Sequence, residues 1–97
     1  MGRELKVVEG EPGEDPILDV PEGWAIGGET LRKEFVFDDF AAAFAFMTRV
    51  AAEAERQNHH PDWSNSWNRV VVELTSHDVG RITARDVRLA HAIDACA

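Results

Sequence analysis

The pattern of apolar and polar residues that follows residue 23 predicts a β-hairpin. A short apolar run at residues 24–26 ends at Gly27-Gly28, a pair typical of hairpin turns because glycine adopts positive φ without steric cost. From Thr30 to Phe37, apolar and charged residues alternate, as in a strand with one buried and one solvated face. We therefore expect two adjacent strands within residues 24–37.

A long amphipathic helix is predicted from about Asp39 to Gln57. Asp39 can accept the unpaired N–H groups of a first helical turn, and the segment contains neither glycine nor proline. The helix should end near Asn58, because Pro61 disfavours helical backbone angles at the residue before it. Apolar residues at spacings of three and four should form the core-facing stripe: Phe40, Phe44, Met47, Ala51 and Ala54.

The second half of the chain predicts a loop, a strand and a final helix. Residues 59–66 are expected to form a loop, in which residues 62–66 could hold one further strand. The segment from Trp67 to Thr75 is rich in β-branched residues, as strands are. After a turn at residues 76–81, Thr83 and Asp86 have the spacing of a capping box that opens a helix. Short connections between these elements predict an α+β fold, an antiparallel sheet with helices packed on one face.

Residues 1–22 differ from the rest of the chain in charge. Seven acidic and two basic residues give this segment −5 of the total net charge of −8. We expect an acidic N-terminal arm that is loosely held and could add one short strand, followed by a single domain at residues 23–97.

Composition also excludes several classes of protein. The acidic balance, with no basic stripe, argues against direct nucleic-acid binding. Cys96 is the single cysteine, so no intramolecular disulfide can form, which is typical of a cytoplasmic protein. The longest apolar run, residues 40–47, is far shorter than the ~20 residues of a membrane helix, and no signal peptide is visible. We therefore expect a cytoplasmic protein without membrane or nucleic-acid partners.

Three of the four histidines lie beside predicted turns. His59 and His60 precede Pro61, and His77 follows a predicted strand, whereas His91 lies within the last helix and has no expected chemical role. A zinc site with three histidines is one interpretation, but adjacent histidines rarely direct both rings at one ion, so we expect no metal. The favoured interpretation is acid–base chemistry, because imidazole exchanges protons near neutral pH.

Tryptophans near these histidines favour a planar ligand. Trp24, Trp63 and Trp67 could offer flat stacking surfaces to an aromatic heterocycle. The alternative is three unrelated turn histidines and three core tryptophans, and the sequence pattern by itself leaves both open.

The spacing of these residues is similar to the signature of the pterin-4a-carbinolamine dehydratase family. The resemblance covers roughly residues 23–94, including the helical run at 43–51 and the segment that begins at Trp67. Residues 1–22 lack the helix with which family members usually begin, and the last helix is shorter. The matching signature residues are Glu55, His59, His60, Pro61, Trp67, His77 and Asp86.

The resemblance implies a fold, an activity and an assembly. The fold is a four-stranded antiparallel sheet with helices on one face, and the assembly is a homodimer or homotetramer. The activity is dehydration of 4a-hydroxytetrahydrobiopterin to quinonoid dihydropterin, which recycles the cofactor of aromatic amino acid hydroxylases and needs no metal or cofactor. The pterin is thus the expected small-molecule partner, and its side chain is left open.

The resemblance also assigns roles. His59 and His77 match the acid–base groups, and His60 matches the histidine that holds the pterin. The further residues that line or support the pocket are Glu55, Pro61, Trp24, Trp67 and Asp86. Without the resemblance, Glu55 could be a solvated helix residue, Asp86 only a helix cap and Trp24 only a core residue.

A second function stays open. Some family members also serve as a dimerisation cofactor for a transcription factor, so a protein-interaction or pterin-binding module with little dehydratase activity is the alternative.

Overall fold

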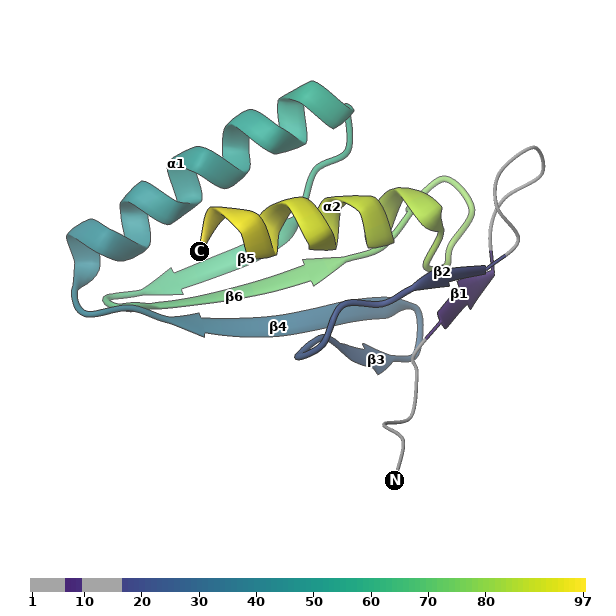
Figure 1. Cartoon of the computed structure of the whole chain (residues 1–97), viewed down its shortest axis with the longest axis horizontal. Coiled ribbons are helices and arrows are strands. Elements are labelled where there is room, and N and C mark those ends of the chain that lie inside the picture. Colours follow the sequence, from purple (N-terminus) through teal and green to yellow (C-terminus); the bar gives the residue numbers. More distant parts are fainter. Residues whose placement is uncertain (1–6, 10–16) are drawn as a thin grey trace.

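The computed structural model describes residues 7–9 and 17–97, and it shows a sheet with two helices on one face (Figure 1). Its four-stranded antiparallel sheet confirms the expected α+β class. No helix in this described part is long and apolar enough to cross a membrane. The elements are β1 Val7–Glu9, β2 Ile17–Asp19, β3 Ala25–Gly27, β4 Thr30–Val36, α1 Phe40–Gln57, β5 Asp62–Ser66, β6 Arg69–Leu74 and α2 Ala84–Cys96.

The sheet has the strand order β3-β4-β6-β5, with every pair antiparallel. Strand β6 pairs with β4 along its whole length, from Leu74 opposite Leu31 to Arg69 opposite Val36. Strand β5, at the edge, occupies residues 62–66, so the extra strand considered there exists and the loop expected over 59–66 is shorter. These pairings place the end of β6 beside the start of β5.

Trp67 is not in a strand, contrary to prediction. It lies in the two-residue turn between β5 and β6, with a positive φ of 50° and a side chain that is largely exposed. The Asn65 amide donates to the carbonyl oxygens of Trp67 and Arg69, at 3.1 and 2.9 Å, and so stabilises the turn. Trp67 thus lies in a turn despite its high strand propensity. The Asn65 side chain supplies hydrogen bonds that strand pairing does not provide at this position.

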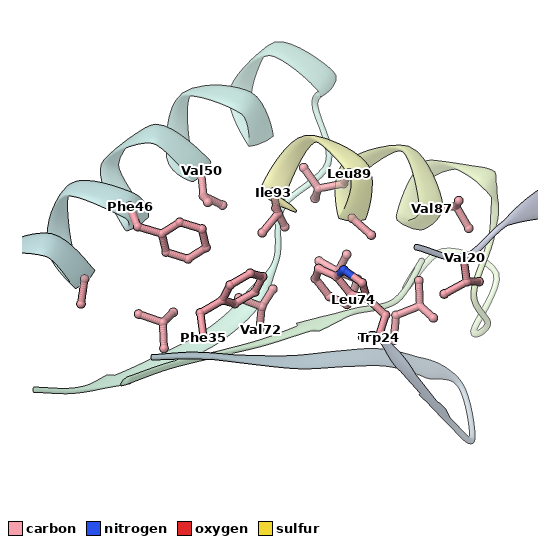
Figure 2. Close-up of a cluster of buried hydrophobic side chains, with 14 residues drawn as sticks. Val20, Trp24, Phe35, Phe46, Val50, Val72, Leu74, Val87, Leu89 and Ile93 are labelled. Carbon is pink, nitrogen blue, oxygen red and sulfur yellow. The ribbon is translucent and has the colours of Figure 1, made fainter. Parts of the chain in front are cut away.

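The core lies between the helices and the sheet (Figure 2). Helix α1 contributes Phe46, whose ring centroid lies 4.8 Å from that of Phe35 and 4.9 Å from that of Phe37. The predicted stripe on α1 was mostly wrong, because Phe40 and Phe44 are exposed. This helix is apolar on two faces, so its periodicity fitted either one. The residues that α1 buries are Ala43, Phe46, Val50 and Ala54.

Both helices are capped as predicted. The Asp39 carboxylate accepts the Ala42 N–H at 2.8 Å at the start of α1. Asn58 ends α1 in the left-handed conformation, with φ 50°, a region that asparagine tolerates better than most residues. Thr83 and Asp86 form the capping box that opens α2.

The described part of the arm contains two strands. Strands β1 and β2 pair antiparallel and contact α2, and Val20 is buried in the core. The His91 ring donates from Nε2 to the Asp19 carbonyl oxygen at 3.0 Å. The expectation of a loosely held arm covers residues 1–22. Residues 1–6 and 10–16 of this arm lie outside the described residues, and the expectation stays a prediction.

A partly buried polar group joins α2 to the sheet at the edge of this core. Trp24 is fully buried, and its indole N–H donates to both Asp94 carboxylate oxygens at 3.1 Å. Lys33, on the core-facing side of β4, also donates to Asp94 at 2.9 Å. Asp94 therefore provides the acceptors for two donors, and the protein would lose stability if these acceptors were removed.

Replacing Asp94 by alanine should lower the free energy of unfolding by about 1–3 kcal/mol, because Trp24 loses the oxygens to which its indole donates. Chemical denaturation followed by tryptophan fluorescence measures the change. Asp38→Ala, at an exposed position, is the control and should cost less than about 0.5 kcal/mol. Equal losses in the two variants would contradict this role for Asp94.

Candidate functional site

Four segments of the chain meet at one end of the molecule: the end of α1, the start of β5, the end of β6 and the start of α2 (Figure 1). Because β5 runs antiparallel to β6, Asp62 lies opposite Glu73 near the end of β6. His59 and His60 follow the left-handed cap of α1, and His77 follows β6 closely. Strand β5 thus provides the reversal that brings the third histidine to the adjacent pair.

His59 is held in a buried hydrogen-bond network. Its Nε2 atom lies 2.6 Å from Asp86 Oδ1. The other Asp86 oxygen accepts from the Ser76 hydroxyl at 2.8 Å and from the Thr83 backbone N–H at 2.9 Å. All four residues are buried, so the imidazole ring has one fixed orientation.

This network also selects a tautomer of His59. An ionised carboxylate can only accept hydrogen bonds, so in the neutral ring it selects the form with the hydrogen on Nε2. The Nδ1 atom is then the nitrogen that can take up a proton. Ser76 and Thr83 complete the arrangement, with their hydroxyl oxygens 2.7 Å apart. Because the Ser76 hydroxyl donates its hydrogen bond to Asp86, it can only accept one from the Thr83 hydroxyl.

The other two histidines each lie against a carboxylate of their own. His60 Nε2 is 2.6 Å from Glu55 Oε2, and His77 Nε2 is 3.2 Å from Asp62 Oδ2. Both pairs are exposed to solvent, unlike His59 and Asp86. The site therefore combines one buried histidine–carboxylate pair with two accessible ones.

The predicted site residues fall into two groups. Hydrogen bonds link each of the three predicted histidines to a carboxylate, and Pro61 lies between His60 and β5. Trp24 is instead bonded to Asp94, about two turns along α2 from Asp86. Trp67 lies at the opposite end of β5 from Asp62. The structure does not place either tryptophan beside the histidines, and their part in a pocket stays a prediction.

Sequence reasoning missed Asp62 and Ser76 as partners in the site. The sequence placed Asp62 in a loop that could hold a strand. Asp62 is the first residue of β5, and its carboxylate faces His77. Ser76 supplies a hydroxyl to Asp86 from the turn after β6. Ser76 lies close to Asp86 because α2 packs back against the end of the sheet, and no local sequence pattern predicts this contact.

A pocket of about 280 Å³ opens beside His59, between the end of α1 and the start of α2. Arg85 donates to Asp78 at 2.9 Å, and this hydrogen bond holds the pKa of the Asp78 carboxyl below its usual value. In the described ranges, no three side chains among His, Cys, Asp and Glu form a group suited to a metal ion. The pocket is lined by Arg56, Gln57, His59, Arg85 and Arg88.

Comparison with known proteins points to one family. A family model described as pterin 4 alpha carbinolamine dehydratase matches residues 13–96. A protein of Rhizorhabdus wittichii, provisionally named a pterin-4-alpha-carbinolamine dehydratase, is 56% identical over 71 residues, covering 73% of each chain. A protein of Prochlorococcus marinus with the same provisional name is 46% identical over 80 residues, covering 82% of this chain and 84% of the relative.

Two solved structures share the fold. A Brucella melitensis protein described as a transcriptional coactivator/pterin dehydratase is 40% identical and covers 78% of this chain and 83% of its own, with a TM-score of 0.74. A pterin dehydratase-like protein identified as a RuBisCO assembly factor in the alpha-carboxysome is 24% identical, covers 76% of this chain and 86% of its own, and has a TM-score of 0.64. At that identity the second likeness concerns the fold alone.

Replacing Asp86 by alanine should cost about 3–5 kcal/mol of unfolding free energy, because it removes the centre of a buried network that also caps α2. Asp62→Ala is the matched control: it removes the carboxylate from an exposed pair and should cost no more than about 1 kcal/mol. Chemical denaturation of both variants measures the difference. Similar losses would show that burial does not distinguish the two pairs.

Proposed function

The chain belongs to the pterin 4 alpha carbinolamine dehydratase family, and from this premise we propose that it dehydrates 4a-hydroxytetrahydropterins such as 4a-hydroxytetrahydrobiopterin to quinonoid dihydropterins. The observation that carries the proposal is the gathering of three histidines, each against a carboxylate, at one end of the fold. A histidine oriented by a carboxylate is a common arrangement for proton transfer.

The reaction needs only proton transfers. An acid gives a proton to the 4a-hydroxyl oxygen, the bond from C4a to that oxygen breaks, and water leaves. A base takes the proton of a ring nitrogen, whose electrons form the new double bond to carbon. No electrons pass to another molecule, so the reaction needs no redox cofactor. Histidines can supply both proton transfers, and we propose that no metal takes part either.

The environments of the histidines support distinct roles. His59 is rigidly held and has one nitrogen occupied by Asp86, as suits a proton-transfer group with a fixed direction. His77 approaches from the end of β6, paired with Asp62, and we assign it the second proton transfer. His60 directly follows His59 in the chain and lies against Glu55 in an exposed pair, and we assign His60 mainly to holding the pterin ring.

The second apolar face of α1 supports the proposal that the protein forms a homodimer or homotetramer. Phe40 and Phe44 are 47% and 56% exposed, and their ring centroids lie 5.8 Å apart. Exposed aromatic residues side by side on a helix are typical of an association surface.

A protein-interaction or pterin-binding module with little dehydratase activity is the second candidate. The same exposed aromatic face, together with the description of the Brucella melitensis structure as a coactivator, favours it. Measuring dehydration of chemically prepared 4a-hydroxytetrahydrobiopterin by the purified protein separates the two candidates.

We expect His59→Ala and His77→Ala each to lower kcat by about 10²–10⁴-fold, because each removes a proton-transfer group. His60→Ala should raise KM more than it lowers kcat, as loss of a ground-state contact does. Steady-state kinetics with the 4a-hydroxy substrate provide both constants.

His91→Ala is the control for these three variants. His91 contacts the Asp19 carbonyl and lies outside the site, so kcat and KM should match those of the parent. A loss of kcat in His91→Ala as large as that in His77→Ala would contradict the assignment, and an inactive but folded parent would favour the interaction module.

Phe44→Ser should shift the protein toward the monomer, because it removes an exposed aromatic ring from the proposed association surface. Size-exclusion chromatography with light scattering gives the mass. Val79→Ser, at a position of similar exposure in the turn before α2 (46%), should leave the mass unchanged. A parent that is monomeric at all concentrations would contradict the proposed assembly.

A further inference from the structure

Positive charge is concentrated in the pocket beside His59. The chain has ten lysine and arginine residues and a net charge of −8, yet three arginines and no acidic residue line this pocket. Arg56 comes from the last turn of α1, and Arg85 and Arg88 come from the first turns of α2. The two helices thus bring basic side chains to a single opening in an otherwise acidic protein.

Two acidic neighbours of these arginines lie outside the pocket lining. Glu53 pairs with Arg56, and Asp78 pairs with Arg85. Each carboxylate holds a guanidinium group in place from one side. A guanidinium carries five N–H donors in a planar fork, so it can keep such a partner and bind an anionic ligand as well.

The pocket is at the small end of the size range of ligand sites. Sites for whole small molecules commonly measure ~300–1,000 Å³, and this pocket measures about 280 Å³. His59 belongs both to its lining and to the histidine group. A substrate whose ring lies over the histidines could therefore place one substituent among the arginines.

We propose that this pocket binds a phosphate monoester on the side chain of the pterin substrate. This inference rests on the proposed dehydratase function and narrows its substrate class. The side chain of a pterin is attached at C6, which is separated from the reacting C4a by a single ring nitrogen. A terminal phosphate on a short C6 chain can thus reach a neighbouring pocket while C4a stays at the histidines. Arginine forks match phosphate oxygens in geometry and charge.

A different use of the arginines would be to stabilise the departing hydroxyl group. That effect would act on every substrate alike, because every 4a-hydroxypterin loses the same group. A phosphate subsite acts only on substrates that carry the phosphate. The ratio of kcat/KM for two substrates that differ only in the phosphate therefore separates the two uses.

The test compares the 4a-hydroxy forms of tetrahydroneopterin and of tetrahydroneopterin 3′-monophosphate. The parent should prefer the phosphorylated substrate by about 10- to 100-fold in kcat/KM, mainly through KM, as charged hydrogen bonds of this kind do. The double variant Arg56→Gln/Arg88→Gln should lose most of this preference, and Arg56→Lys/Arg88→Lys should recover part of it. Arg32→Gln, on β4 opposite Glu73 and outside the pocket, is the matched control and should keep the preference.

Equal kcat/KM values for both substrates in the parent would overturn the inference. So would a preference that survives in the double glutamine variant. Inorganic phosphate should compete with the phosphorylated substrate. If phosphate binds at the arginines but the phosphorylated substrate has no advantage, the pocket is a site for free anions and the inference is also overturned.

Failure of the dehydratase function has a separate signature. If the parent dehydrates neither substrate, isothermal calorimetry with 7,8-dihydroneopterin and its 3′-monophosphate tests the pocket alone. Tighter binding of the monophosphate to the parent, lost in the double glutamine variant, would support the subsite even without turnover. Equal binding of the two ligands would overturn it.

Discussion

Asp86 has its two oxygens hydrogen-bonded to three different segments of the chain, in a place shielded from water. His59 comes from the end of α1, Ser76 from the turn after β6, and the Thr83 N–H from the start of α2. A buried carboxylate is tolerated only when its oxygens are satisfied, so these segments must meet in one arrangement. The helix start, the packing of α2 against the end of the sheet and the direction of the His59 ring are fixed by the same few contacts.

Local chemistry was enough to predict much of this fold. The ends of α1 follow from Asp39 and from the chain that leads to Pro61, and the start of α2 follows from Thr83 and Asp86. Each depends on hydrogen bonds between residues close in sequence, which spacing records directly. The three histidines were selected by their places beside predicted turns. That they share one site was implied only by the resemblance to the family, because periodicity does not show that the chain reverses between His60 and His77.

The remaining features depend on contacts between distant residues. Helix α1 is apolar on two faces, and only its packing against α2 and the sheet decides that Phe46, and not Phe44, is inside. Trp67 has strong strand propensity, but it lies in a turn whose second residue, Asn68, donates a hydrogen bond to the distant Phe37 carbonyl oxygen. The pairing of His77 with Asp62 follows from the register of β5 against β6. No local sequence pattern predicts any of these three features.

The double role of Asp86 affects how relatives of this protein should be interpreted. Asp86 caps α2 as well as orienting His59. A relative that had lost the dehydratase activity would therefore still be selected to keep an aspartate at this position, because the fold requires it. Asp62 and His77 are exposed and contribute little to stability, so without catalytic selection they would drift. Across the family, retention of the exposed pair is therefore the more informative marker of a working enzyme, and retention of Asp86 marks only an intact fold.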